Sequence, residues 1–141
     1  MIPRSALWLG LAGLIPFVGL ALTGLAAAPT PLRGWEDRIM LHYGIVILSF
    51  MSGVLWGFAT KASGSAAALG YGLSVIPALW AFFTTTGPTP QAISALMLGF
   101  VGLLGLDWYF WRQGLAPVWW MRLRLILTSG VLASLAIGLY L

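Results

Sequence analysis

The charged and histidine side chains of this sequence are so few that each candidate for chemistry can be weighed by itself. His42 is the only histidine, and it follows the adjacent carboxylates Glu36 and Asp37. A metal site of the zinc type needs three or four well-placed ligands, which one imidazole and two neighbouring carboxylates do not supply. We therefore predict no metal and no cofactor, and we treat His42, Glu36 and Asp37 as a polar group near a helix end. The alternative is that His42 alone ligates a pigment or haem.

Asp107 is the most suggestive carboxylate, because it is the first charged residue after Lys61. An acid within an apolar span pairs with a cation or belongs to a functional path. Arg122 and Arg124 follow after a short turn, which brings them back beside Asp107. We predict an ion pair from Asp107 to Arg122 or Arg124 that locks a helical hairpin. A proton-relay carboxylate is the alternative, but no chain of protonatable groups is evident.

Other motifs that would carry catalysis are missing from the sequence. Cysteine is absent, which excludes disulfides, thiolate metal sites and cysteine nucleophiles. Nucleotide-binding loops, catalytic triads and paired-carboxylate motifs are also lacking, so we predict no catalytic residue and no enzyme. The net charge of +4 reflects scarce acids and not a clustered basic face, so nucleic acid is not a predicted partner.

The composition indicates which elements hold these residues in place. Hydrophobic residues make up 60% and charged residues 7% of the chain, whereas soluble domains carry about 25% charged residues. Apolar stretches of about 20 residues span a bilayer as helices. Five can be cut from the chain, at residues 6–27, 40–60, 66–85, 91–111 and 119–141.

These segments predict one all-α transmembrane domain over residues 1–141, a polytopic bundle of five membrane-spanning helices in the lipid bilayer. The turns are short, so neighbouring helices must run antiparallel. The first segment is longer than the apolar region of a signal peptide, and we expect it to be retained.

Basic residues set the predicted orientation. Five lie on one side (Arg4, Lys61, Arg112, Arg122 and Arg124) and two on the other (Arg33 and Arg38). Because cytoplasmic loops carry the excess of Lys and Arg, we expect the N-terminus inside and the C-terminus outside.

Small residues recur every four positions in several predicted helices, a spacing that lets helix backbones approach closely in lipid. We predict helix packing along three stripes: Gly19, Thr23 and Ala27; Ser49, Gly53 and Gly57; and Gly130, Ser134 and Gly138. The alternative is that one stripe faces outwards and docks a partner subunit. Pro16 and Pro77 lie within predicted helices, and each predicts a kink.

Aromatic residues gather at the predicted turn between the last two helices: Trp108, Tyr109, Trp111, Trp119 and Trp120. Amphipathic rings favour the headgroup level of a bilayer, so we predict an interfacial belt. A chlorophyll- or quinone-binding group is the alternative.

Two segments of the chain resemble a family pattern. The run from His42 to Gly57 contains Tyr-Gly, then Ile-Leu-Ser-Phe, then Gly-x-x-Trp-Gly. Later come Asp107, a Pro-x-Trp at Pro117, and Leu-Arg followed by Leu-Thr at Leu123 to Thr128. These motifs are similar to those of an uncharacterised inner-membrane family of proteobacteria, found in animals as a mitochondrial transmembrane protein.

The resemblance covers residues 34–134 and implies a bundle in the bacterial inner membrane, with no established activity. The sequence departs from the family at Leu55, where a histidine often precedes Trp-Gly. Together with the small-residue stripes, the resemblance favours an accessory or assembly subunit of an energy-transducing membrane complex. A small-solute or lipid binding and transport protein, using a pocket near the two prolines, is the alternative. A membrane enzyme ranks last.

Overall fold

The computed structural model describes the chain over residues 1–26 and 35–140, with its side chains over 1–23 and 37–139. The elements within these ranges are helices: α1 (Arg4–Gly13), α2 (Ile15–Ala26), α3 (Trp35–Ala59), α4 (Gly64–Ser74), α5 (Ile76–Thr84), α6 (Thr89–Arg112) and α7 (Trp120–Tyr140). They make five helical segments long and apolar enough to cross a membrane. The all-α prediction with five spanning helices is confirmed.

The first and third spans are each broken into two helices. The break lies at Leu14 between α1 and α2, and at Val75 between α4 and α5. Each break is two residues before a proline, Pro16 or Pro77, and both prolines follow an isoleucine. Proline has no N–H to give to the helix, and its ring clashes with the preceding turn. The predicted kinks are therefore confirmed.

Helix α3 supplies a hydroxyl to each break. The Tyr43 hydroxyl donates a hydrogen bond of 2.9 Å to the carbonyl oxygen of Gly13. Gly13 stands three residues before Pro16, where the helical ladder is interrupted. A backbone carbonyl freed inside a bilayer needs a protein partner, because no water is there to replace the lost bond.

At the second break the hydroxyl enters the ladder itself. The Ser52 hydroxyl donates to the carbonyl oxygen of Ser74 and accepts a bond of 3.3 Å from the Ala78 N–H. These two backbone groups would bond to each other in an uninterrupted helix. Ser52 and Ser74 are both buried, so the insertion ties the broken α4–α5 span to the middle of α3.

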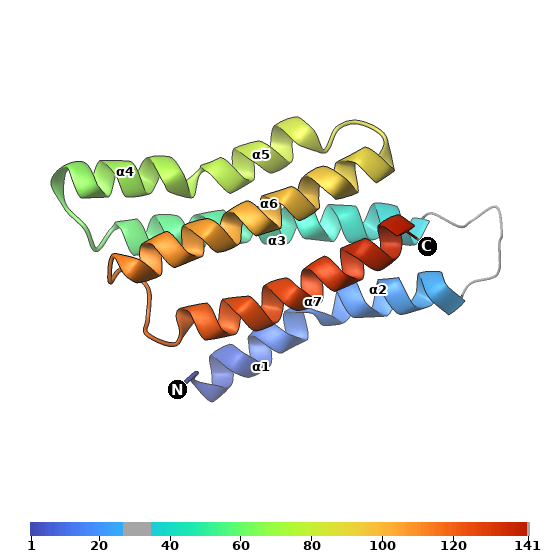
Figure 1. The fold of residues 1–141 in the computed structure, drawn as a ribbon, viewed down its shortest axis with the longest axis horizontal. Coiled ribbons are helices and arrows are strands. Elements are labelled where there is room, and N and C mark those ends of the chain that lie inside the picture. Colours follow the sequence, from blue (N-terminus) through green and yellow to red (C-terminus); the bar gives the residue numbers. More distant parts are fainter. Residues whose placement is uncertain (27–34, 141) are drawn as a thin grey trace.

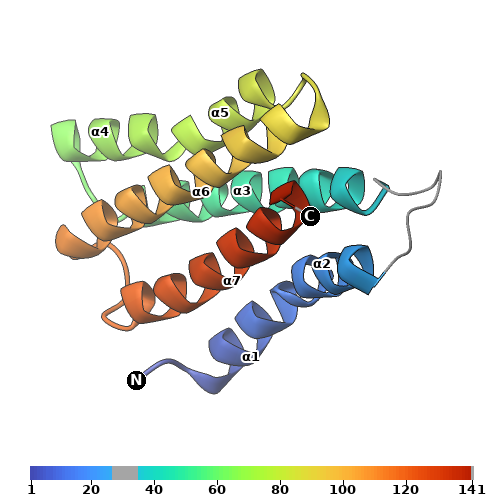
Figure 2. The ribbon, with the colours of Figure 1, turned by 45° about the vertical axis from the view of Figure 1, so that its right-hand side comes forward.

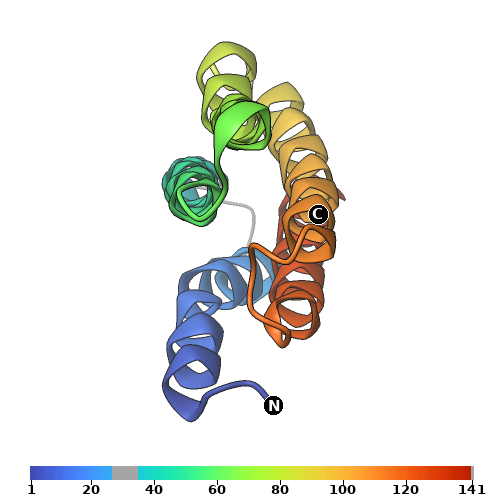
Figure 3. The same cartoon turned by 90° about the vertical axis from the view of Figure 1, so that its left-hand side faces the viewer.

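Helix α3 lies in the middle of the bundle. It contacts α2, α4, α5 and α6, while α7 packs between α6 and α2. Figure 1 shows the helices side by side, and Figure 3 shows the same arrangement end-on, with α3 facing α6 and α7. Figure 2 shows α1 and α2 along the outer side of α7.

The core forms where one face of α3 meets one face of α6. On α3 the buried positions recur every three or four residues, as at Gly44, Leu48 and Leu55, which is the period of one helical face. Gly44 gives Leu96 its place, because a Cβ at Gly44 would collide with Leu96 Cδ2 and would displace that side chain. Phe17 of α2 completes the core, edge-on to Tyr43 at 5.0 Å and to Phe100 at 6.3 Å between ring centroids.

Candidate functional site

The most polar point inside the bundle is the Asp107 carboxylate, which is fully buried on α6. Its Oδ2 accepts a bond of 2.8 Å from Arg124 Nε, and its Oδ1 accepts a bond of 3.0 Å from Trp120 Nε1. Both donors come from the first turns of α7. We call Asp107, Trp120 and Arg124 the buried polar cluster.

The turn after α6 brings these side chains together. Helix α6 ends at Arg112, and Gly114 follows with φ of +75°, a conformation that glycine adopts without strain. The Leu115 N–H bonds to Phe110 O at 3.0 Å, and the Gly114 N–H bonds to Trp111 O at 3.1 Å. This pair of bonds is the Schellman motif, which closes a helix C-terminus and reverses the chain. Helix α7 therefore starts alongside the last turns of α6.

The structure places Asp107 against Arg124 and leaves Arg122 exposed. Two residues along a helix are about 200° apart around its axis, so only one of these arginines can face α6. The orientation argument also changes, because Arg124 is 4% exposed and serves Asp107 instead of the membrane surface. Arg33 lies outside the described residues.

Two buried polar atoms have no hydrogen-bond partner: Arg124 Nη2, within the cluster, and Thr128 Oγ1, beside it. Thr128 stands one turn after Arg124 on the same face of α7. The carboxylate has a donor on each oxygen, so the arrangement fixes the α6–α7 hairpin. A proton relay would need further protonatable partners in line with Asp107, and its immediate donors are an arginine and an indole.

The aromatic group at this end divides into two parts. Trp108 and Trp111 are exposed, as the belt interpretation expects; the Arg112 guanidinium lies 5.4 Å over the Trp108 ring. Trp120 is instead buried and bonded to Asp107. Its ring also meets Phe58 of α3 edge-on at 5.0 Å. We predicted that Trp120 belongs to the interfacial belt, but it is a buried residue that holds the α6–α7 hairpin together.

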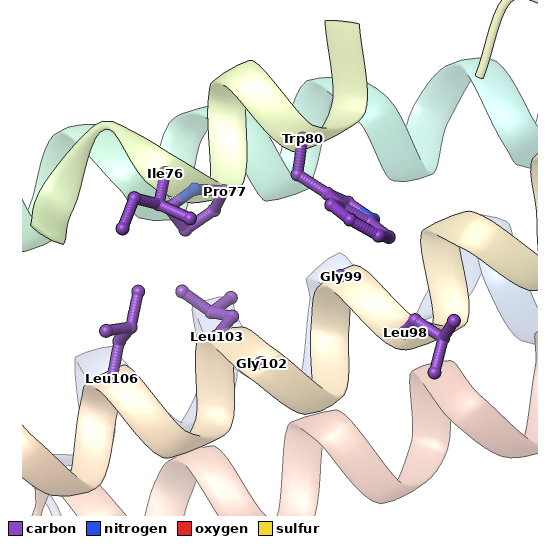
Figure 4. Close-up of a pocket in the computed structure, with 8 residues that line it drawn as sticks. All are labelled: Ile76, Pro77, Trp80, Leu98, Gly99, Gly102, Leu103 and Leu106. Atoms are coloured by element: carbon purple, nitrogen blue, oxygen red, sulfur yellow. The ribbon is translucent and has the colours of Figure 1, made fainter. Parts of the chain in front are cut away.

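An apolar groove of about 410 Å³ lies between α5 and α6. Figure 4 shows Ile76, Pro77 and Trp80 of α5 facing α6, where Gly102 has no side chain to fill the space. The remaining wall consists of Leu98, Gly99, Leu103 and Leu106. The Trp80 indole is fixed by a 2.7 Å bond from Nε1 to Ala95 O. The groove is lined by Pro77, one of the two prolines near which we predicted a pocket from the sequence.

The predicted polar group around His42 is divided by the structure. Five residues turn a helix by about 140°, so Asp37 and His42 face different neighbours. Asp37 faces α7, because a Cβ added at Gly138 would stand 3.0 Å from Asp37 Oδ1. His42 instead lines an open cavity together with Arg38. The Glu36 side chain is outside the described residues. Of the two described side chains, Asp37 is thus directed towards α7 and His42 towards the cavity.

The stripe on α7 packs inside the bundle. A Cβ at Gly130 would stand 2.8 Å from Leu14 Cδ1, and one at Gly138 would approach Asp37 and Met40. Ser134 is buried and donates to Gly130 O at 2.9 Å.

The other two stripes face outwards. The glycines of these stripes are exposed: Gly53 and Gly57 on α3, and Gly19 on α2. A Cβ added at any of them would have no neighbouring side chain within 4 Å. Ser49 and Thr23 are exposed as well, and Ala27 lies outside the described residues. The prediction that these stripes pack helices within the chain is wrong for the described positions, because the buried face of α3 follows Gly44, Leu48 and Leu55 instead.

Comparisons with known proteins show the family of this chain and a named relative. The model of a family described as "Protein of unknown function (DUF3429)" matches residues 2–140. The chain is 35% identical over 137 residues to Transmembrane protein 69 of Xenopus tropicalis, with 94% of this chain and 53% of that protein covered. It thus spans about half the length of this relative. No solved structure matches. With the five spans, these findings identify a multi-pass transmembrane protein.

Proposed function

The chain belongs to the DUF3429 family, and we propose that it is a non-catalytic accessory or assembly subunit of an energy-transducing complex in the bacterial inner membrane. The observation that carries this proposal is the outward stripe on α3. Ser49, Gly53 and Gly57 lie on consecutive turns of one face, and the chain's own helices do not cover them.

Such a stripe suits a partner helix more than it suits lipid. Small residues let another backbone approach closely, so that van der Waals contacts and weak hydrogen bonds can form. Phe50 and Trp56 stand beside the stripe with 65% and 48% of their surface exposed. The rings flank a strip of small residues that a partner helix can approach closely.

The remaining surface supports an assembled state. The five hydrophobic windows are between 11% and 39% buried within the protein. Lipid can cover the rest, but a chain with little outside the bilayer has its membrane faces as the main surface for recognition. We therefore place the partner within the membrane.

We further propose that the N-terminus is cytoplasmic. The exposed cations Arg4, Lys61, Arg112 and Arg122 belong to the end at which α1, α4 and α7 start, which Figure 1 shows together. The chain has no cysteine, so single cysteines at Ser63 and Gly87, in turns at opposite ends, can report the topology. In intact cells, a membrane-impermeant maleimide should label G87C and spare S63C; the reverse pattern would overturn the orientation.

The accessory role is tested by filling the stripe. G53L and G57L add side chains where no atom of the chain lies, so the fold should persist. Solubilised in mild detergent at native expression, the wild type should migrate on a native gel with a respiratory or photosynthetic complex in fixed stoichiometry, and G53L/G57L should migrate alone. G102L is the matched control, because it adds the same side chain at another exposed glycine. Solitary migration of the wild type would reject the role.

A second candidate function is lipid binding in the α5–α6 groove. Its eight lining residues present hydrocarbon, one indole and two glycines, and the middle of α6 at Gly99 and Gly102 corresponds to the middle of a span. This lining favours an acyl or prenyl chain over a polar solute. G102L should then displace a co-purifying lipid that G53L/G57L retains. The two variants thus exchange roles as test and control for the two functions.

A further inference from the structure

A second cavity, of about 460 Å³, opens on α3 at the end opposite the buried polar cluster. Arg38, Ile39, His42, Tyr43 and Val46 line it. None of these residues belongs to the buried polar cluster, to the α5–α6 groove or to the outward stripe on α3.

The cavity is polar at one end and apolar at the other. Arg38 and His42 are one turn apart and therefore share a face of the helix, and both side chains are exposed. Val46 follows one turn further, and eight residues from Arg38 to Val46 cover about 12 Å along the axis. Val46 and Ile39 are 54% and 46% exposed. The cavity thus runs from the helix end, near the membrane surface, into the hydrocarbon.

The polar groups of the lining are donors. Arginine has donors only, and histidine offers at least one N–H in either protonation state. The Tyr43 hydroxyl is already bonded to Gly13 O. None of the described lining residues is acidic, and Asp37 lies on the side of α3 that faces α7. The described lining residues therefore suit an anion and offer no carboxylate to an ammonium headgroup.

We propose that this cavity binds an anionic phospholipid, with the phosphate on Arg38 and His42 and an acyl chain along Ile39 and Val46. The guanidinium fork matches phosphate oxygens in pairs. The exposed apolar residues below the cations select a lipid over free phosphate, because a headgroup anchored at Arg38 leads its chain along them. The site is independent of the proposed accessory role.

The test uses the full chain, purified with equal amounts of phosphatidylglycerol and phosphatidylcholine and examined by native mass spectrometry. The wild type should retain one phosphatidylglycerol in preference to phosphatidylcholine. R38Q should lower this retention about fivefold, the factor that corresponds to one basic residue near an anionic surface, and R38Q/H42Q should lower it further. Both side chains are exposed, so unchanged gel filtration and tryptophan fluorescence should confirm folding.

The charge-matched control is R122Q, which removes an exposed arginine at the opposite end. It should leave most of the retained lipid in place. Equal losses in R38Q and R122Q would indicate diffuse attraction to the whole protein and would overturn the site. Equal retention of the two lipids by the wild type would overturn it without any variant.

Inorganic phosphate in millimolar excess distinguishes the source of the anion. A bound phospholipid should resist it, because the acyl chain contributes to binding. Complete displacement by phosphate would show an anion site without a chain and would overturn the assignment to a lipid. V46W fills the apolar end and should weaken phosphatidylglycerol retention while leaving both cations in place; unchanged retention would contradict the placement of the chain.

Discussion

Helix α6 is attached to two of its neighbours, α7 and α5, in opposite ways. Towards α7, a buried carboxylate receives one bond from Arg124 and one from Trp120, both side chain to side chain. Towards α5, the contact consists of apolar side chains and glycines, with a single bond from the Trp80 indole to the Ala95 carbonyl. The first side is closed, and the second contains a groove of about 410 Å³.

This contrast shows how a membrane bundle can combine a fixed geometry with an open surface. Lipid is as apolar as leucine, so apolar contacts between helices do not by themselves choose one arrangement. A buried ion pair with directed hydrogen bonds does choose one, because each donor has a single acceptor to reach. The bonds between α6 and α7 thus fix the position of α6 in the bundle. The contact between α6 and α5 does not have to fix it and can contain a groove.

The largest expected effect is the loss of the carboxylate. D107A leaves Arg124 buried without its counter-ion and Trp120 without its acceptor, and breaking such a pair costs about 3–5 kcal/mol. We expect the midpoint of SDS-induced unfolding in mixed micelles to fall accordingly. R122A is the control, since exposed substitutions change stability by about 0.5 kcal/mol or less. Equal losses in D107A and R122A would remove the contrast between the two sides of α6.

The apolar side should respond to added volume. A Cβ at Gly99 would stand 2.9 Å from both Leu48 Cδ2 and Trp80 Cδ1, so G99A should overpack this contact and cost about 1–3 kcal/mol. G102A, three residues away in the same groove, meets no atom and should be neutral or stabilising. The same unfolding measurement compares the pair. If G102A were as costly as G99A, the groove would be filled by the protein itself.

On the apolar side, the break between α4 and α5 is also bonded to α3, through the Ser52 hydroxyl. S52A removes the hydroxyl between Ser74 O and the Ala78 N–H, and hydrogen bonds between membrane helices are worth about 1–2 kcal/mol in model peptides. We expect a loss of that size, together with faster hydrogen exchange around Val75. S49A, an exposed serine on the same helix, should change neither quantity. Matching exchange in both variants would show that Ser52 does not hold the break.

The smallest effect is expected next to the ion pair. Thr128 Oγ1 is buried without a partner, so T128V removes an unsatisfied group and should be neutral or stabilising, within about 1 kcal/mol. S134A, which loses a partly buried bond to Gly130 O, should destabilise slightly under the same conditions. A clear loss in T128V would mean that the hydroxyl is engaged by a bound water and that the polar side extends one turn further.

The spans and their interruptions could be predicted because the signals are local. Charged residues are so rare that each marks a helix end or a partner, and a proline inside an apolar run interrupts the ladder wherever it occurs. The N-terminus of α3 was harder to place, because the structure starts this helix at Trp35, before the charged residues. A helix can begin in the membrane interface and carry Asp37 and Arg38 on its first turns.

The site could be predicted only to the level of spacing. The sequence offers Arg122 and Arg124 to Asp107 equally, and the choice depends on which face of α7 meets α6. Trp120 was missed, although it stands four residues before Arg124 and so shares that face. The hydroxyl donors Tyr43 and Ser52 were missed as well, since only the fold shows that each lies opposite a proline break.

The direction of the small-residue stripes could not be predicted. In a soluble helix, polarity separates the buried face from the exposed one, but both faces of a membrane helix are apolar. Gly53 and Gly130 therefore have similar surroundings in sequence, although Gly53 faces out of the bundle and Gly130 meets Leu14. Their surroundings differ only after neighbouring helices have taken their places.

The two hydroxyl bonds of α3 also relate to the order in which the chain is synthesised. The Gly13 carbonyl precedes its donor Tyr43 by 30 residues, whereas Ser52 precedes its acceptor Ser74 by 22. During synthesis the first break must wait for α3 to enter the bilayer, but the second break meets a donor that is already there. Helix α3 is thus the segment whose insertion completes the first span and prepares the place of the third.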